Sequence, residues 1–186
     1  MNQRPRIIHD ARGAVYVEFL VAFLPVFVFF LCLLQLALLF SSKLLVDHAA
    51  VQGARAAAVV FGDEPGPYRD GAAEVNTLAR GRKQAVRDAV LVSLAPVILD
   101  GSIGRVNVAF PKEDVPGGND QVTDTKLAPM ASAGPTMMRV RVEVDVVCKI
   151  AIANLILCAG RLGQHRVASA SAEALYPYQG ASYAYE

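Results

Sequence analysis

The hydropathy pattern is dominated by one long uncharged stretch near the start of the chain. From Phe19 to Ser42 no residue carries a charge, and Gln35 is the main polar interruption. A helix of that length is about 36 Å long at ~1.5 Å per residue, enough to cross a hydrocarbon core of about 30 Å with some tilt. Pro25 lies inside the stretch, and membrane helices tolerate proline with a local kink. The pattern predicts a single transmembrane helix at residues 14–42.

The charges on either side of this helix predict its orientation. Three arginines precede it against the acid Asp10, whereas Lys43 behind it is soon balanced by Asp47. A basic excess marks the cytoplasmic flank of a membrane helix, so residues 1–13 form a cytoplasmic leader and the chain beyond residue 43 is exported. The leader arginines are Arg4, Arg6 and Arg12.

Two kinds of cleaved export signal fit the stretch less well than a transmembrane helix does. A cleaved secretory signal has an apolar region of ~7–15 residues followed by a small-residue site, but this stretch is longer and residues 36–40 offer no such site. A lipoprotein signal carries small residues before its cysteine, whereas Cys32 follows two phenylalanines and a leucine. We therefore interpret Cys32 as an ordinary residue of the membrane helix.

Residues 43–61 contain no proline and continue the helix beyond the membrane. Small residues recur in them at a spacing of four, which lets another helix or a sheet approach closely. One interpretation is an alanine-rich helix packed on its own domain, and the other is contact between subunits in a filament-like bundle. The packing positions are Ala49, Gly53, Ala54 and Ala57.

Residues 62–186 are predicted to form the exported domain. A Pro/Gly-rich loop at 62–71 is followed at 72–99 by apolar residues at offsets of three and four, which indicate an amphipathic helix. Its charged face is expected to be a solvated surface, with attraction to lipid headgroups as the alternative. The charged residues of that face are Arg80, Arg82, Lys83, Arg87 and Asp88.

Alternation of apolar and polar residues predicts strands at 103–110, 138–148 and 165–176. In the second of these, valines alternate with Arg139, Arg141, Glu143 and Asp145, and the alternating charge suits cross-strand pairing. Three antiparallel strands against a long helix, with the second amphipathic helix, predict an α+β fold of pilin-like kind.

Three further segments of the exported domain carry weaker signals. The apolar residues 150–157 are too few to span a bilayer, so we expect a helical turn buried under the sheet, or one that dips toward the membrane or a partner subunit. The acidic loop 111–136 matches no calcium-binding spacing. Tyrosines concentrated in residues 176–185 suit either an interface or a partly ordered terminus.

Two of the three cysteines, Cys148 and Cys158, fall in the exported domain. An even number of cysteines in an oxidising compartment predicts a disulfide, which here would close a loop around the apolar segment 150–157. A zinc site is disfavoured because no further cysteine or nearby histidine pair completes a ligand set.

Composition and motifs exclude several classes of function. The net charge is +1 and no basic stripe is visible, so nucleic acid is not an expected partner. The sequence contains no phosphate-binding loop, no zinc-protease motif and no nucleophile elbow, and its three histidines are scattered. We therefore expect no enzyme, no cofactor and no metal.

The start of the apolar stretch carries a more specific pattern. Gly13 directly precedes the predicted helix 14–42, and Glu18 follows five residues later, next to Phe19. A carboxylate at the edge of a membrane span is costly and indicates a function, although it can also simply reach outward to water. The pattern resembles the processing site of type IV prepilins. The resemblance implies that a prepilin peptidase cuts after Gly13 and leaves Ala14 as the new N-terminus.

The new amine on Ala14 would carry a positive charge close to the bilayer. Glu18 can offset that charge in its own chain or in a neighbouring subunit, because a paired charge costs far less in a low dielectric than a lone one. Gly13 suits a protease because a residue without Cβ lets the backbone approach catalytic groups closely.

The resemblance extends beyond the processing site. After the span, residues 48–58 read His-Ala-Ala-Val-Gln-Gly-Ala-Arg-Ala-Ala-Ala, and residues 169–173 read Ser-Ala-Ser-Ala-Glu. With Glu18, Phe19 and Pro25, these features are similar to the TadE family of minor pseudopilins, from the tight-adherence (Flp) pilus systems of bacteria. The resemblance implies a structural subunit in the inner membrane or in an extracellular pilus. Its implied partners are the prepilin peptidase, other pilins or pseudopilins, the pilus assembly platform and the lipid bilayer.

A second function class stays open. The chain can instead be a membrane-anchored periplasmic scaffold or binding protein that keeps its N-terminus. The two classes differ in the fate of residues 1–13, which the first removes and the second retains.

Overall fold

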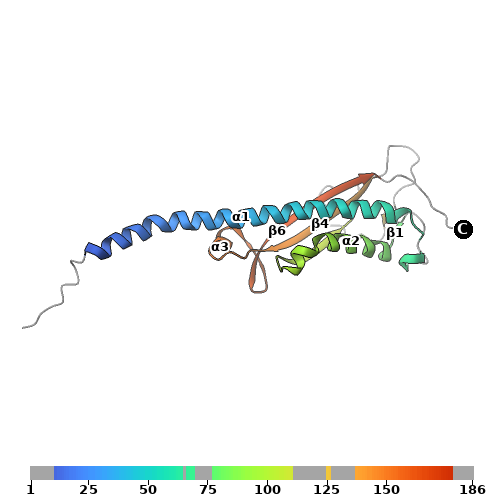
Figure 1. Ribbon diagram of the computed structural model, residues 1–186. Helices are drawn as coiled ribbons and strands as arrows, with labels where there is room; N and C mark the ends of the chain where they lie inside the picture. The colour runs from blue at the N-terminus through green and yellow to red at the C-terminus, as the bar shows by residue number, and fades with distance from the viewer. Residues whose placement is uncertain (1–10, 65, 70–76, 111–124, 127–136, 178–186) are drawn as a thin grey trace, which may run out of the picture.

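The computed structural model describes residues 11–64, 66–69, 77–110, 125–126 and 137–177. One helix, α1 (Ala11–Gly62), is 52 residues long and runs along the whole elongated molecule (Figure 1). Its N-terminal half projects alone, and its C-terminal half packs against a second helix and a sheet. We call this second part, α1 from Gln35 onward with everything packed on it, the head. The fold is thus α+β, as predicted.

The main sheet of the head has four antiparallel strands in the order β2-β4-β6-β5. Val144 of β4 pairs with Val106 of β2 on one side and with Ala170 of β6 on the other. The strands are β2 (Ile103–Ala109), β4 (Met137–Val147), β5 (Gly160–Leu162) and β6 (His165–Pro177). The three predicted strands are confirmed, and β5 was missed because three residues carry no readable alternation.

The amphipathic helix α2 (Arg80–Leu99) starts later than the predicted residue 72. The residues just before it, β1 (Thr77–Leu78), pair with β3 (Thr125–Lys126) in a separate two-stranded ribbon. This pairing with a segment far along the chain is invisible to local periodicity. The remaining elements are a 3-10 turn, η2 (Gly66–Tyr68), and the short helix α3 (Ala153–Leu157).

The core of the head lies between α1, α2 and one face of the sheet. The alternate residues of β4 predicted to face inward are all buried, as are three apolar residues of α2. These residues are Val140, Val142, Val144 and Val146 from β4, and Val86, Val90 and Leu94 from α2. The period-two interpretation of β4 is therefore confirmed side chain by side chain.

The small residues of α1 face this core. Ala49, Ala54 and Ala57 have no exposed surface, and Gly53 is buried among them. A Cβ added at Gly53 would lie 2.7 Å from a γ-carbon of Val90 and 3.2 Å from a γ-carbon of Val140. Carbon atoms pack best at about 3.5–4.0 Å, so only glycine permits this approach of α1 to α2 and β4. On this face, the spacing of small residues serves packing within the chain.

The prediction that the charged face of α2 is solvated is wrong at two positions. Arg82 has no exposed surface and Lys83 is 8% exposed, although both carry a charge. The N-terminal turn of α2 lies against the end of α1, where the guanidinium of Arg82 donates a 2.6 Å hydrogen bond to the carbonyl oxygen of Asp63. The other charged residues of that face, Arg80, Arg87 and Asp88, are exposed as predicted.

Several predictions lie outside the described residues. They concern the leader residues 1–10, the start of the amphipathic helix at 72–76, the acidic loop except for residues 125–126, and the tyrosines after residue 177.

Candidate processing site and membrane-proximal region

The predicted processing site lies at the start of α1. Gly13 and Ala14 fall in its first turn, and the helix continues without a break through Glu18 and Phe19. Ala14 and Glu18 are four residues apart, which places them about 6 Å apart along the axis on the same side of a helix. The side chain of Glu18 is exposed. A new amine on Ala14 would therefore lie one turn from this carboxylate in the same chain.

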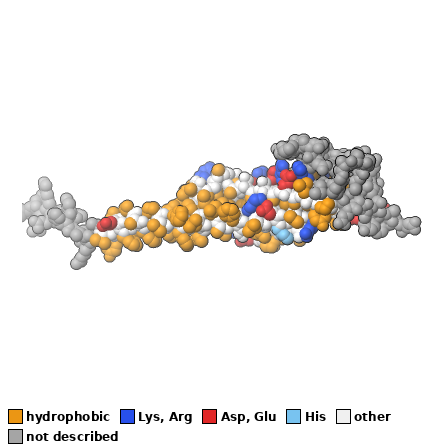
Figure 2. Space-filling model, turned by 90° about the horizontal axis from the view of Figure 1, so that it is seen from above, with side chains coloured by type: hydrophobic (Ala, Val, Ile, Leu, Met, Phe, Trp, Pro, Cys, Tyr) orange, Lys and Arg blue, Asp and Glu red, His pale blue; other side chains and the backbone are white. Residues whose placement is uncertain are grey.

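Beyond Glu18, α1 is covered by exposed apolar side chains. The rings of Phe19 and Phe23 stack at 5.5 Å between centroids, and those of Phe23 and Phe27 at 5.7 Å. The most apolar part of α1 buries nothing against the rest of the chain, and α1 is long and apolar enough to cross a membrane. Figure 2 shows hydrophobic side chains along this half, while basic and acidic side chains gather on the head.

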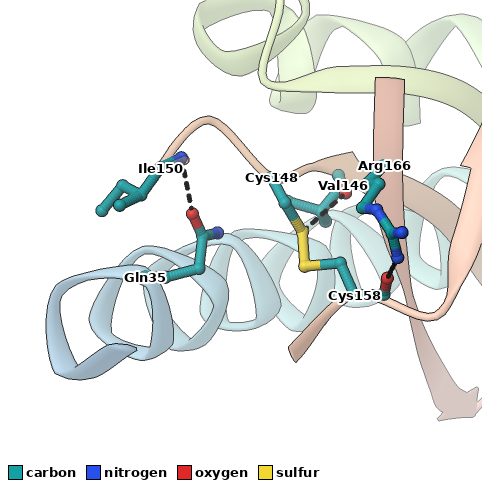
Figure 3. The surroundings of a disulfide bond; sticks show 6 residues. All are labelled: Gln35, Val146, Cys148, Ile150, Cys158 and Arg166. Carbon is teal, nitrogen blue, oxygen red and sulfur yellow. Dashed lines mark hydrogen bonds between the residues drawn. A yellow bond between two sulfur atoms is a disulfide. The ribbon is translucent and has the colours of Figure 1, made fainter. Parts of the chain in front are cut away.

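Gln35 marks the end of the bare part of α1. It is the first buried residue of the helix among those described, at 1% exposed. Its side-chain oxygen accepts a 3.0 Å hydrogen bond from the backbone N–H of Ile150 (Figure 3). The helix from Val15 to Gln35 is about 30 Å long, the thickness of a hydrocarbon core. The predicted span at 14–42 therefore overlaps the head, where Ser42 is also buried.

A disulfide between Cys148 and Cys158 closes the loop that contains α3, as predicted. Both cysteines are buried, and their Cα atoms are 6.6 Å apart. The loop is further tied to β6, because Cys148 N–H donates to the carbonyl of Arg166 at 2.9 Å and the Arg166 guanidinium donates to the carbonyl of Cys158 at 3.3 Å (Figure 3). Cys32 is free and half-buried in α1.

The prediction that the apolar segment 150–157 is buried under the sheet is wrong. Within α3 only Ala153 is buried, while Leu155 and Ile156 are 62% and 63% exposed. The reason is that α3 packs on α1 at the N-terminal end of the head, beyond the edge of the sheet (Figure 1). The alternative, a segment that dips toward the membrane or a partner subunit, stays a prediction.

A groove of about 390 Å³ lies between α1 and β6, next to the bare part of α1. Leu36, Leu39 and Phe40 line one side, and residues 168–171 of β6 line the other. The ammonium group of Lys43 lies at this groove and bonds to the carboxylate of Asp47 and to the carbonyl of Ser171. The sequence feature that could have indicated this groove is the Ser-Ala-Ser-Ala repeat of β6, because its small side chains leave space beside α1.

The face of the sheet that points away from α1 carries cross-strand ion pairs. Arg105 lies 2.8 Å from Asp145, and Arg141 lies 2.8 Å from Glu173. The predicted pairing of alternating charges is therefore confirmed for these residues.

Within the described ranges, no three histidine, cysteine or acidic side chains gather in a way that holds a metal ion.

Comparisons of the chain with protein-family models, with curated proteins and with solved structures found no match. What the molecule does is therefore inferred from its own residues and geometry. Two features stand out: the bare apolar half of α1 with a carboxylate at its start, and the disulfide-closed loop where the head meets that half.

Proposed function

We propose that this chain is a minor pseudopilin, a single-pass membrane subunit that is cut after Gly13 and takes part in assembling or initiating a Flp or type IV-like pilus. The observation that carries the proposal is the construction of α1. One continuous helix forms a bare apolar rod in its N-terminal half and the spine of an α+β head in its C-terminal half. Such a rod can lie in a bilayer or beside the rods of other subunits with the same apolar surface.

Glu18 gives the proposal its chemistry. It is the only charged residue between Ala14 and Ser42, and its side chain is exposed. A lone carboxylate in hydrocarbon is strongly unfavourable, so a rod of this kind needs a cationic partner for it. Cleavage after Gly13 creates that partner one helical turn away, or in the next subunit when subunits pack side by side. The resulting role is structural, and the expected surroundings are lipid, other subunits and the assembly platform.

The backbone at the cleavage point favours a second candidate in one respect. The helix already includes Ala11, so Gly13 and Ala14 are helical before any cut. A chain that keeps its leader would use α1 as its anchor, and the protein would serve as a membrane-attached scaffold. The first turn of a helix lacks internal partners for its N–H groups and opens at low cost, so the helical start is also compatible with a peptidase.

Intact-mass measurement of the membrane-extracted protein distinguishes the two functions. In cells with an active prepilin peptidase, we expect a chain that starts at Ala14, and in cells without the peptidase a chain that retains residues 1–13. Gly13→Ala should block the cut more than Glu18→Ala does. Retention of Met1 in cells that contain the peptidase would leave the anchored scaffold as the function.

The role of Glu18 is tested separately by incorporation into assembled pili. Glu18→Gln keeps the shape of the side chain and removes the charge, so we expect processing to continue and incorporation to fall. Glu64→Gln removes an exposed charge just beyond the C-terminal end of α1, far from the rod, and serves as the matched control. If both variants assemble as the unmodified protein does, the pairing of Glu18 with an amine is wrong.

A further inference from the structure

The helix α3 presents an aliphatic surface to the outside of the molecule. Ile152, Leu155 and Ile156 are 45%, 62% and 63% exposed, and no residue from Ile150 to Leu157 carries a charge. We call these three side chains the α3 patch. Three neighbouring aliphatic side chains exposed on one short loop are unusual for a surface in water, where such patches mark binding to lipid or to a partner.

The loop that carries the patch is held firmly in place. The Cys148–Cys158 disulfide closes it, and the hydrogen bond from Ile150 to Gln35 ties it to α1 (Figure 3). Ala153 within the loop is completely buried. Ile152 has a φ of 69°, a left-handed backbone conformation that β-branched residues rarely adopt. The patch is therefore fixed in an exposed orientation by covalent and hydrogen-bonded constraints, and its exposure does not reflect a loose end.

The patch lies where the bare part of α1 ends. Gln35, the anchor point of the loop, is about 30 Å along the helix from Val15, so the loop lies at the far boundary of a hydrocarbon core that begins near Val15. On α1 itself, exposed apolar side chains continue through this level, with Leu38 49% and Phe40 63% exposed. The apolar surface of the rod and the α3 patch are thus at the same end of the head (Figure 1).

We propose that the α3 patch is an interfacial anchor that inserts into the headgroup–acyl boundary of the leaflet on the side of the head. This inference rests on the proposed membrane span of α1. Apolar side chains of interfacial segments enter this boundary to a depth of about 5–10 Å, which the three side chains of the patch, on α3 and just before it, can reach. The exposed basic residue Arg161 follows the loop and suits the phosphates of lipid headgroups, whereas Lys149, before the loop, pairs with Asp100.

Lipid fits the patch better than a protein partner because of its position. A partner would need to reach a surface that lies within the headgroup layer once α1 spans the bilayer. With α1 as one attachment and the α3 patch as a second, the head cannot tilt freely relative to the membrane surface. The anchor therefore fixes which side of the head faces the membrane while the subunit waits for assembly.

The chain contains no tryptophan, so a single introduced tryptophan reports its own surroundings. The full-length chain is reconstituted at low protein density into phosphatidylcholine vesicles without bromine, with bromine on the acyl chains near the headgroup, or, for the rod probe, with bromine near the chain ends. Bromine quenches nearby tryptophan. Leu155→Trp probes the patch and Ile156→Trp repeats the test at a second position. Val59→Trp, 67% exposed on α1 in the head, is the control that lies far from lipid, and Leu24→Trp probes the rod.

We expect emission from Leu155→Trp and Ile156→Trp to lie at shorter wavelength than that from Val59→Trp and to lose intensity in brominated lipid, while Val59→Trp is unchanged. Quenching of Leu24→Trp with no quenching at either patch position would overturn the anchor and leave the span intact. Absence of quenching at Leu24→Trp would overturn the span, and the anchor with it. A blue-shifted but unquenched patch tryptophan would mean that protein covers the patch, which also overturns the proposal. Proper closure of the loop is checked in each variant by the shift of its mobility on reduction.

Discussion

Gly53→Ala tests whether the small residues of α1 serve packing inside the chain or contact between subunits. Alanine is favoured over glycine by about 0.8–1.0 kcal/mol in a helix interior, so the substitution stabilises any helix in which the new methyl group has room. In this structure the methyl carbon would lie 2.7 Å from a γ-carbon of Val90, roughly 1 Å inside the optimal contact distance. Overpacking of this kind costs about 1–3 kcal/mol.

The two effects have opposite signs, and the structure predicts that overpacking wins. We expect a net loss of about 1 kcal/mol in the free energy of unfolding, equivalent to a fall in Tm of roughly 2–4 °C for a chain of this size. Thermal unfolding of the full chain in detergent, followed by circular dichroism, measures it. Gly53→Ala in a Val90→Ala background provides the matched control, because the clash is then largely removed.

In that background we expect Gly53→Ala to be neutral or mildly stabilising, which gives a coupling energy between positions 53 and 90 of about 1–2 kcal/mol. A different result follows if the face of Gly53 contacts other subunits. The isolated chain would then gain stability from Gly53→Ala, with no coupling to Val90. A rise in Tm in the unmodified background would refute the packing of α1 against α2 as the reason for this glycine.

Three further perturbations test other parts of the head. Gln35→Leu should leave the N–H of Ile150 without its acceptor at a cost of about 1–3 kcal/mol and speed exchange of that amide proton, whereas unchanged exchange would show that Gln35 does not hold the loop. Replacement of both Cys148 and Cys158 by serine should lower the free energy of unfolding by about 2–3 kcal/mol, measured by denaturant titration against the oxidised protein, with Cys32→Ser as the control. The hydroxyl of Ser102 and the ammonium of Lys149 hold the pKa of Asp100 below its usual 3.8. The ionised carboxylate therefore stabilises the fold above pH 3.8, and this contribution is lost as the pH falls through the lower pKa of the folded state. Asp100→Asn should therefore flatten the loss of stability below about pH 4, and an unchanged acid profile would contradict the pairing.

Local patterns predicted most elements of the fold because each depends on residues close in sequence. The alternation of valines and charges at residues 139–146 indicates β4 directly, because successive side chains of a strand point to opposite faces. Offsets of three and four indicate α2, because residues at those offsets lie on one face of a helix. The long apolar stretch indicates the rod. The disulfide was also predictable, since the exported part of the chain offers only two cysteines.

Other features depend on segments that meet only in the folded chain. Charge alone suggested that Arg82 faces water, and it is buried because the end of α1 supplies a carbonyl acceptor. The ribbon between β1 and β3 joins residues 77–78 to residues 125–126, which no local pattern links. Polar character alone did not single out Gln35 as the point where the head begins, since its partner Ile150 lies 115 positions further along the chain.

The sequence by itself determined the apolar rod, its single carboxylate at Glu18, and the order of helices and strands, because hydropathy and side-chain periodicity are local properties. Only the tertiary structure decided which way the apolar residues face. It turned the small residues of α1 inward onto Val90 and Val140, and it left Leu155 and Ile156 outside at the level of Gln35. An apolar side chain favours burial wherever it stands in the sequence, and the packing of distant segments settles whether protein or another phase covers it.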